Sequence, residues 1–204
     1  MTWRKRIFDI FFALLLVVIL GPILLGLLIW LLIREGRPIF YVAERMKTPD
    51  QPFNLWKLRT MTVVDSDAGV SGGDKSSRIT RTGAWLRSKR LDEFPQLWNI
   101  LRGDLSFVGP RPPLRQYVED HPEIYAQVLK SRPGVTGLAS IVYHRHEAAL
   151  LTRCKTPAQT NAVYSRTCVP AKARLDLIYQ RHQSTCYDFD LVFQTIGNLF
   201  RRSG

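Results

Sequence analysis

The strongest constraint in this sequence is an uncharged, apolar run from Ile10 to Ile33, IFFALLLVVILGPILLGLLIWLLI. A membrane-spanning helix needs roughly 20 such residues, so the run is long enough to enter a bilayer. A signal peptide fits poorly, because its apolar part is only about 7–15 residues long and no small-residue cleavage site follows this run. The sequence therefore predicts a membrane segment that remains on the mature protein.

Gly21 and Pro22 interrupt the middle of this run. Proline removes a backbone donor and clashes with the preceding turn, so we expect the helix to kink or break there. Each half then reaches only about 17 Å, near half the hydrocarbon thickness. Basic residues flank the run on both sides, so the positive-inside rule gives no orientation for a span. A simple kinked single-pass anchor is the alternative, but we predict a re-entrant hairpin over residues 1–37.

Composition points to an anionic partner. The chain has 204 residues and a formal net charge of +12, which suits nucleic acid, an acidic membrane surface or a phosphorylated substrate. A membrane-tethered nucleic-acid binder is disfavoured, because no helix-turn-helix, RNA-binding or zinc-finger pattern is present and the basic residues form no continuous stripe. Residues 38–204 are expected to form one cytosolic, membrane-associated domain.

The expected fold class is α+β and mainly helical. Short alternating segments at 38–46 and 52–61 predict a β-hairpin, and residues 65–77 are typical of a mobile loop. Apolar spacings of three and four predict helices, and the last of them has an apolar face that suits either the core or the membrane interface. The predicted helical segments are 84–91, 94–103, short pieces within 114–134, 170–183 and 187–202.

An adjacent acid pair, Asp92 and Glu93, stands within the most basic part of the chain, between Lys57 and Arg111. As a purely structural alternative, Asp92 is a helix N-cap and Glu93 favours the positive end of the helix. Neighbouring arginines should keep both carboxylates ionised and lower their pKa values. A carboxylate can attack phosphorus, and its neighbour can help hold the divalent cation that screens a diphosphate.

Arg111 lies in VGPRPP, between Pro110 and Pro112. Both prolines fix their own torsions and restrict the residues before them, so the guanidinium extends from a stiff support. Arginine presents a planar fork that matches phosphate oxygens. A proline-rich surface turn is the alternative interpretation of this motif.

Three segments carry a family resemblance: KLRTM (57–61), RITRTGAWLRSKRLDEFPQLWNILRGDLSFVGPRPP (78–113) and RPGVTGLAS (132–140). In this order they resemble the bacterial sugar transferases that are monotopic polyprenyl-phosphate phosphoglycosyl transferases of the small, catalytic-core type. The resemblance runs over nearly the whole chain. It implies magnesium-dependent transfer of a sugar-1-phosphate from a nucleotide diphosphosugar, usually a UDP-sugar, to polyprenyl phosphate. That reaction initiates a surface glycan or glycoprotein glycan.

The resemblance also assigns roles to residues. Asp92 would be the nucleophile of a ping-pong reaction through a phosphosugar-aspartyl intermediate, and Glu93, with Asp92, would hold Mg²⁺. Phosphate and substrate binding would fall to four cations, Arg87, Arg111, Lys57 and Arg59. The break at Gly21 and Pro22 resembles the one that makes the family's membrane helix re-entrant. A catalytically inactive, membrane-anchored subunit of a glycan-assembly complex is the alternative function.

The implied location is the bacterial inner membrane, with a monotopic anchor and the catalytic domain facing the cytoplasm. Expected partners are undecaprenyl phosphate, a nucleotide sugar, membrane lipids and downstream glycosyltransferases, with a homodimer as one assembly state and with no nucleic acid. The sequence leaves the sugar and the pathway open. The segment 141–168 departs from the family pattern, and its His144, His146 and Glu147 suit either sugar contact or a solvated basic loop, with a zinc site disfavoured.

Overall fold

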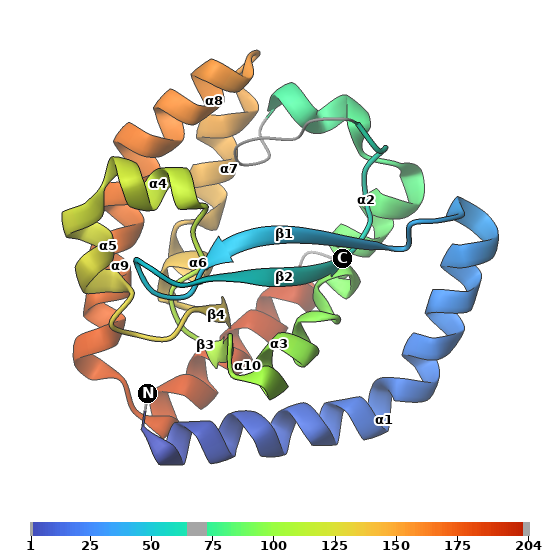
Figure 1. Ribbon diagram of the computed structural model, residues 1–204, viewed down its shortest axis with the longest axis horizontal. Helices are drawn as coiled ribbons and strands as arrows, with labels where there is room; N and C mark the ends of the chain where they lie inside the picture. Colours follow the sequence, from blue (N-terminus) through green and yellow to red (C-terminus); the bar gives the residue numbers. More distant parts are fainter. Residues whose placement is uncertain (1, 65–72, 202–204) are drawn as a thin grey trace.

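The computed structural model describes residues 2–64 and 73–201 and is mostly helical (Figure 1). Its first half contains α1 (Trp3–Glu35), β1 (Phe40–Met46), β2 (Pro52–Leu58), η1 (Gly73–Arg78), α2 (Arg81–Ser88), η2 (Leu91–Glu93), α3 (Gln96–Arg102) and β3 (Ser106–Val108). Its second half contains α4 (Arg115–Asp120), α5 (Pro122–Val128), β4 (Gly134–Thr136), α6 (Leu138–Val142), α7 (His144–Thr152), α8 (Pro157–Val163), η3 (Tyr164–Cys168), α9 (Val169–His182) and α10 (Thr185–Arg201).

The apolar run forms one helix, α1, that bends but does not break. Thr2 caps its N-terminus and Gly36 ends it with a φ of 69°, a conformation that favours glycine. Pro22 lies inside the helix, and α1 changes direction along its length in Figure 1. Of the kink or break expected at Gly21 and Pro22, the structure has the kink and not the break: α1 continues past the proline, which only bends it.

Both ends of α1 pack against the rest of the chain. Near the N-terminus, the Lys5 ammonium donates to Asp188 Oδ2 of α10 at 2.6 Å, and Asp9 Oδ1 accepts from the Ser106 hydroxyl at 3.0 Å. Near the C-terminus, Leu31 is buried, and Arg59 donates to the carbonyl oxygen of Glu35 at 2.7 Å. Both ends of α1 are therefore held by the same folded domain, which the rest of the chain forms.

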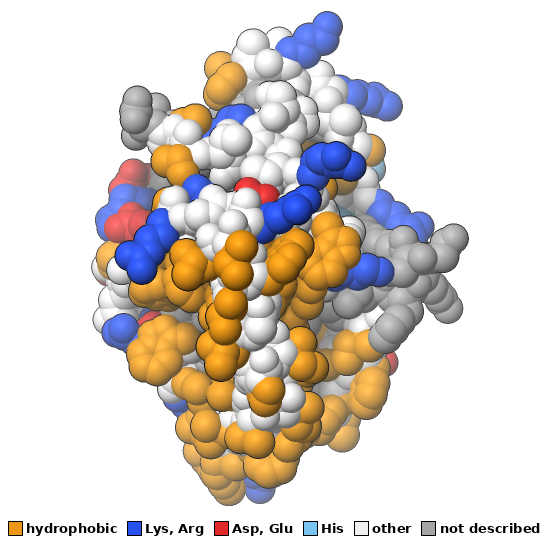
Figure 2. All heavy atoms as spheres, turned by 90° about the vertical axis from the view of Figure 1, so that its right-hand side faces the viewer, with side chains coloured by type: hydrophobic (Ala, Val, Ile, Leu, Met, Phe, Trp, Pro, Cys, Tyr) orange, Lys and Arg blue, Asp and Glu red, His pale blue; other side chains and the backbone are white. Residues whose placement is uncertain are grey.

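Between its ends, α1 exposes apolar side chains. They include Val18, Ile23, Leu25 and Ile29. Figure 2 shows hydrophobic side chains covering the lower part of one face of the molecule, with Lys and Arg side chains above them. Within the described residues, α1 is the one helix that is long and apolar enough to cross a membrane by length and composition.

The predicted hairpin is confirmed. β1 and β2 pair antiparallel, with Phe40 opposite Leu58 and Met46 opposite Pro52. A second, parallel pair of β3 and β4 was not predicted from the sequence, because each strand has only three residues and no periodicity can develop. This pairing places residues 109–112, which contain Arg111, close to residues 132–134.

The helical predictions are confirmed over α2 to α5 and over α9 and α10. Gly103 ends α3 with a φ of 82°, as its position after the apolar repeat indicated. Of the loop predicted at 65–77, residues 65–72 lie outside the described residues, whereas 73–78 form the 3-10 helix η1. The main core joins β1 to α4, α5, α7 and α9 and is centred on Tyr117, Cys168 and Val169.

Candidate active site

The acid pair lies in η2, a single 3-10 turn between α2 and α3. The preceding Arg90 has a φ of 56°, in the left-handed region that few non-glycine residues adopt. Helix α3 begins only at Gln96, its N-cap is Pro95, and no side chain caps it. Asp92 therefore caps no helix, and the structural alternative for this residue is wrong.

Three cations surround Glu93, whose side chain is 11% exposed. Its Oε2 lies 2.8 Å from the Arg90 guanidinium, and its Oε1 lies 3.4 Å from Lys57 Nζ and 3.7 Å from Arg111 Nη1. Burial alone would raise the pKa of this carboxyl, but the charges of Lys57, Arg111 and Arg90 outweigh burial and hold the pKa well below its usual range. Glu93 is therefore ionised at neutral pH.

Asp92 has a different environment from its neighbour. It is 9% exposed, and none of the described residues donates a hydrogen bond to its carboxylate. Burial raises the pKa of Asp92, the adjacent charge of Glu93 raises it further, and Lys57 and Arg87 oppose the shift. The expected lowering of both pKa values is thus confirmed for Glu93 and wrong for Asp92. A carboxylate without hydrogen bonds keeps its lone pairs available for attack.

Lys57 reaches the site from β2, where it pairs with Tyr41 of β1. Its side chain is 17% exposed. Burial lowers the pKa of the ammonium, and the negative charge of Glu93 offsets part of this effect. Trp56 and Leu58 flank Lys57, so this short strand carries a single cation between two apolar side chains.

Arg111 reaches the site from the loop after β3. The Gly109 amide donates to the Thr136 carbonyl oxygen at 2.9 Å, which ties the start of this loop to β4. A Cβ on Gly109 would lie 2.1 Å from the Arg132 carbonyl oxygen, so the close approach of the two segments requires glycine. The prolines on either side and this contact together hold the guanidinium near Glu93.

The remaining predicted cations lie in different places. Arg87 donates from Nε to Thr60 Oγ1 at 2.8 Å and lies close enough to Asp92 to oppose its pKa shift. Arg59 instead donates to the carbonyl oxygens of Glu35 and Gly36, at 2.7 and 3.3 Å. Carbonyl groups at a helix C-terminus have no intrahelical partner and attract cations. Arg59 thus holds the end of α1, whereas Lys57, Arg87 and Arg111 gather around the acid pair.

Two further cations of the site, Arg90 and Arg45, were not predicted from the sequence. Arg90 pairs directly with Glu93, three residues away, a spacing that could have been recognised. Arg45 on β1 carries a positive charge near Arg111 and Lys57. Its position became evident only once the hairpin register was known, because the pairing brings β1 beside β2.

Residues 144–152 form helix α7 rather than a loop, and His144 and His146 are exposed on it, as the solvated alternative expected. Glu147 pairs with Lys172 of α9 at 2.9 Å, and its negative charge helps to raise the pKa of Arg111 against the effect of burial. The His146 ring lies 5.1 Å from that of Tyr143. Among the described residues no group of three or more metal-type side chains is found. His144, His146 and Glu147 therefore belong to no such group in the described part of the chain.

The donor set at η2 fits Mg²⁺ better than zinc. It consists of two adjacent carboxylates, Asp92 and Glu93. Mg²⁺ is commonly bound by one or two carboxylates together with substrate phosphates and water, rather than by a complete cage of protein ligands. Two carboxylates alone do not complete the coordination of Mg²⁺. The phosphates of a bound substrate and water would supply the remaining ligands.

Comparison with known proteins shows the family of the chain. The family model for bacterial sugar transferases matches residues 1–202. The chain belongs to the bacterial sugar transferase family. A UDP-glucose:undecaprenyl-phosphate glucose-1-phosphate transferase of Klebsiella pneumoniae is 32% identical over 200 residues, which cover 94% of this chain and 39% of that protein.

Other members of the family differ in the sugar that their names state. A UDP-N-acetylgalactosamine-undecaprenyl-phosphate N-acetylgalactosaminephosphotransferase of Aeromonas hydrophila is 27% identical over 98% of this chain and 44% of its own length. The uncharacterised sugar transferase EpsL of Bacillus subtilis is 39% identical over 67% of each chain. The chain thus spans about two fifths of the length of the glucose and N-acetylgalactosamine transferases.

Proposed function

We propose that this protein transfers a sugar-1-phosphate from a UDP-sugar to undecaprenyl phosphate, yielding undecaprenyl-diphosphate-sugar and UMP. The observation that carries the proposal is the state of Asp92, which is buried, accepts no hydrogen bond from the described residues and lies beside four cations, Lys57, Arg87, Arg90 and Arg111. The relatives named for this reaction support the substrate classes. The family's range of sugars leaves the donated sugar open.

The first step uses Asp92 as a nucleophile. One carboxylate oxygen attacks the phosphorus that carries the sugar, the bond between the two phosphates breaks, and UMP leaves with the bonding electron pair. The product is an acyl phosphate, in which the sugar phosphate is joined to the Asp92 carboxylate as a mixed anhydride. Arg111 and Arg87 neutralise the phosphate oxygens as charge moves onto the leaving group. Asp92 and Glu93, together with the diphosphate, would hold Mg²⁺, which would supply further charge neutralisation.

The second step regenerates the enzyme. An oxygen of undecaprenyl phosphate attacks the same phosphorus, and the Asp92 carboxylate leaves. A covalent intermediate lets one small site receive a soluble nucleotide and a membrane lipid in turn, which is a ping-pong scheme. Glu93 takes no part in bond making, and its pairs with Lys57 and Arg90 fix the positions of these cations.

The same proposal includes a re-entrant anchor. A straight helix of 33 residues would be about 50 Å long, longer than the hydrocarbon core of about 30 Å, so a spanning α1 would place its ends on opposite sides of the bilayer. Yet Lys5 and Leu31 are both buried against the same body. Entry and exit on one face, with the bend inside the membrane, reconcile these facts. We place the catalytic domain on the cytoplasmic side of the inner membrane, where nucleotide sugars are available.

The reaction is tested by mixing purified protein, Mg²⁺ and undecaprenyl phosphate with a panel of UDP-sugars and measuring UMP. At least one donor should release UMP, Asp92→Asn should release none, and Asp120→Asn, an exposed acid on α4, should behave as the wild type. Absence of UMP with every donor, from folded protein, would contradict the proposal.

The anchor is tested by cysteine labelling from one side of oriented vesicles. Single cysteines at positions 2 and 36, in a variant without the native cysteines, should both react with an impermeant maleimide added on the cytoplasmic face. Labelling of the two positions from opposite faces would support a spanning helix and refute the hairpin.

A further inference from the structure

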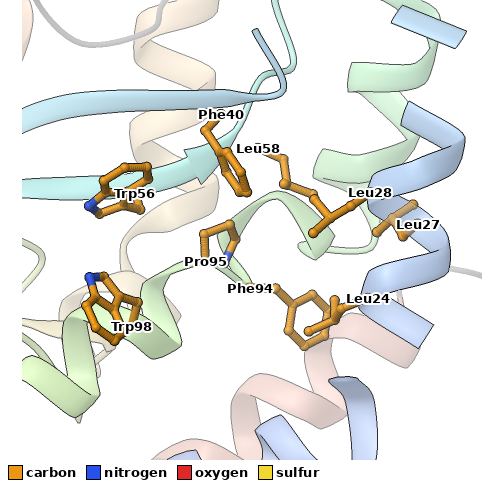
Figure 3. Close-up of a pocket in the computed structure, with 9 residues that line it drawn as sticks. All are labelled: Leu24, Leu27, Leu28, Phe40, Trp56, Leu58, Phe94, Pro95 and Trp98. Carbon is orange, nitrogen blue, oxygen red and sulfur yellow. The ribbon is translucent and has the colours of Figure 1, made fainter. Parts of the chain in front are cut away.

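An apolar cavity of about 370 Å³ lies between the second half of α1, the β-hairpin and the start of α3 (Figure 3). Leu24 and Leu28 of α1 line one side, and Trp56 and Trp98 line the other. The lining is almost entirely hydrocarbon and aromatic. A cavity of this composition excludes the nucleotide and the sugar of the donor, because both would leave their polar groups without partners.

The cavity and the charged site share their walls. On β2, Lys57 turns toward Glu93, whereas Trp56 and Leu58 line the cavity, as alternation along a strand requires. On the other wall, Phe94 and Pro95 line the cavity and directly follow Glu93 in the chain. Lys57 and Glu93, at the edge of the cationic site, therefore each lie one residue away from side chains that line an apolar space. This arrangement suits a ligand with a phosphate head joined directly to a hydrocarbon chain.

We propose that this cavity binds the isoprene units of the lipid acceptor that are nearest its phosphate. The inference rests on the proposed function, which makes the acceptor a polyprenyl phosphate. At a share of about 30 Å³ for each carbon group, similar to that of a water molecule, the space of about 370 Å³ holds about a dozen groups, or the first two or three isoprene units. The rest of the chain passes along α1 into the bilayer.

Occupation of the cavity positions the acceptor phosphate. With its first units between Trp56 and Trp98, the acceptor is anchored beside η2, where its phosphate reaches the phosphosugar on Asp92. The walls of the cavity therefore contribute to acceptor binding and leave the attack of Asp92 on the donor unaffected. This separation makes the cavity testable apart from the chemistry.

The test uses Trp98→Ala, with Trp85→Ala as the matched control. Trp98 is 54% exposed and Trp85 on α2 is 47% exposed, so either truncation should be tolerated, and Trp85 does not line the cavity. The first step alone is followed as exchange of labelled UMP into the UDP-sugar without acceptor. The complete reaction gives the KM for undecaprenyl phosphate and for farnesyl phosphate, which has three isoprene units.

For Trp98→Ala we expect unchanged UMP exchange and a KM about tenfold higher for both acceptors, the loss expected when one large apolar contact is removed. Trp85→Ala should match the wild type in both assays. Wild-type KM values in Trp98→Ala, or a rise for undecaprenyl phosphate alone, would overturn the cavity assignment. Absence of UMP exchange in the wild type would instead refute the proposed function.

A photoreactive acceptor identifies the occupant directly. Farnesyl phosphate with a diazirine on its second isoprene unit is bound to the wild type in phosphatidylethanolamine and phosphatidylglycerol vesicles, and the crosslinks are mapped by mass spectrometry. Crosslinks to residues 56, 95 and 98 that excess undecaprenyl phosphate removes would support the proposal. Crosslinks that disappear only with more phospholipid would show that an acyl chain fills the cavity, and they would overturn it.

Discussion

Removal of the buried charge of Lys5 should destabilise the protein strongly. The Lys5 ammonium donates to Asp188 Oδ2 at 2.6 Å and to the Tyr179 hydroxyl at 3.1 Å, and the Tyr179 hydroxyl donates to Asp188 Oδ1 at 2.6 Å. The side chains of the ion pair are only 6% and 3% exposed, so water screens little of the interaction. Lys5→Met would leave the Asp188 carboxylate buried with one remaining donor.

The expected cost follows from this geometry. Breaking a buried pair by removal of one partner costs about 3–5 kcal/mol of unfolding free energy. For a domain of this size each kcal/mol lowers Tm by about 2–4 °C, so the thermal transition should fall by about 6–20 °C. Because apolar replacement of both partners is often neutral, Lys5→Met combined with Asp188→Leu should recover much of the loss.

The assay is thermal and denaturant unfolding of the purified protein in nanodiscs. Lys47→Met is the control, since the Lys47 and Asp104 pair spans 3.2 Å with side chains 24% and 16% exposed and should contribute about 1 kcal/mol or less. Equal effects of Lys5→Met and Lys47→Met would refute the reasoning. So would a double variant that is no more stable than the single one.

Three further predictions concern the site. Gly109→Ala should abolish turnover and lower stability, because the new Cβ would lie 2.1 Å from the Arg132 carbonyl oxygen and displace the loop that carries Arg111. UMP release measures the turnover, and thermal unfolding followed by circular dichroism measures the stability. Burial raises the pKa of Asp92, and only the ionised carboxylate attacks, so UMP exchange should fall on acidification at a higher pH than for an ordinary aspartate. Lys57→Met removes an opposing charge and should move this acid limb to still higher pH, whereas an unmoved limb would contradict the assignment. Removal of Mg²⁺ with EDTA should stop UMP exchange, and added Mg²⁺ should restore it.

Local sequence signals predicted much of the helical and hairpin structure. The apolar repeat closed by Gly103 defines α3, and the alternating segments define β1 and β2 because these signals act over a few residues. The parallel pair of β3 and β4 could not be predicted, since three-residue strands form only when distant segments meet. The continuity of α1 past Pro22 likewise depends on what holds its ends.

The candidate site was predicted in composition but not in arrangement. Asp92 and Glu93 stand out because acids are rare in this basic stretch, and the structure brings Lys57, Arg87 and Arg111 around them. Arg59, by contrast, binds the end of α1. Its role could not be predicted from composition, because alternation would put positions 57 and 59 on the same face, whereas β2 ends at Leu58 and Arg59 beyond it turns to the carbonyl groups of α1.

The raised pKa of Asp92 and the adjoining cavity also depend on tertiary structure. Charge counting alone predicts a lowered pKa, but burial outweighs the nearby cations at this residue. Trp56 and Trp98 are 42 positions apart in the sequence, and only the contact of β2 with α3 makes them walls of one space. Burial and shape, rather than residue type, therefore define these two features.

The central claim is that Asp92 carries the sugar phosphate between the two substrates. The most direct measurement is intact-protein mass spectrometry after incubation with a UDP-sugar and Mg²⁺ in the absence of undecaprenyl phosphate. We predict a mass increase of one sugar-phosphate, located on Asp92 by peptide mapping, lost on addition of undecaprenyl phosphate and absent from Asp92→Asn. An Asp92→Asn protein that still acquires the adduct or turns over normally would contradict the account.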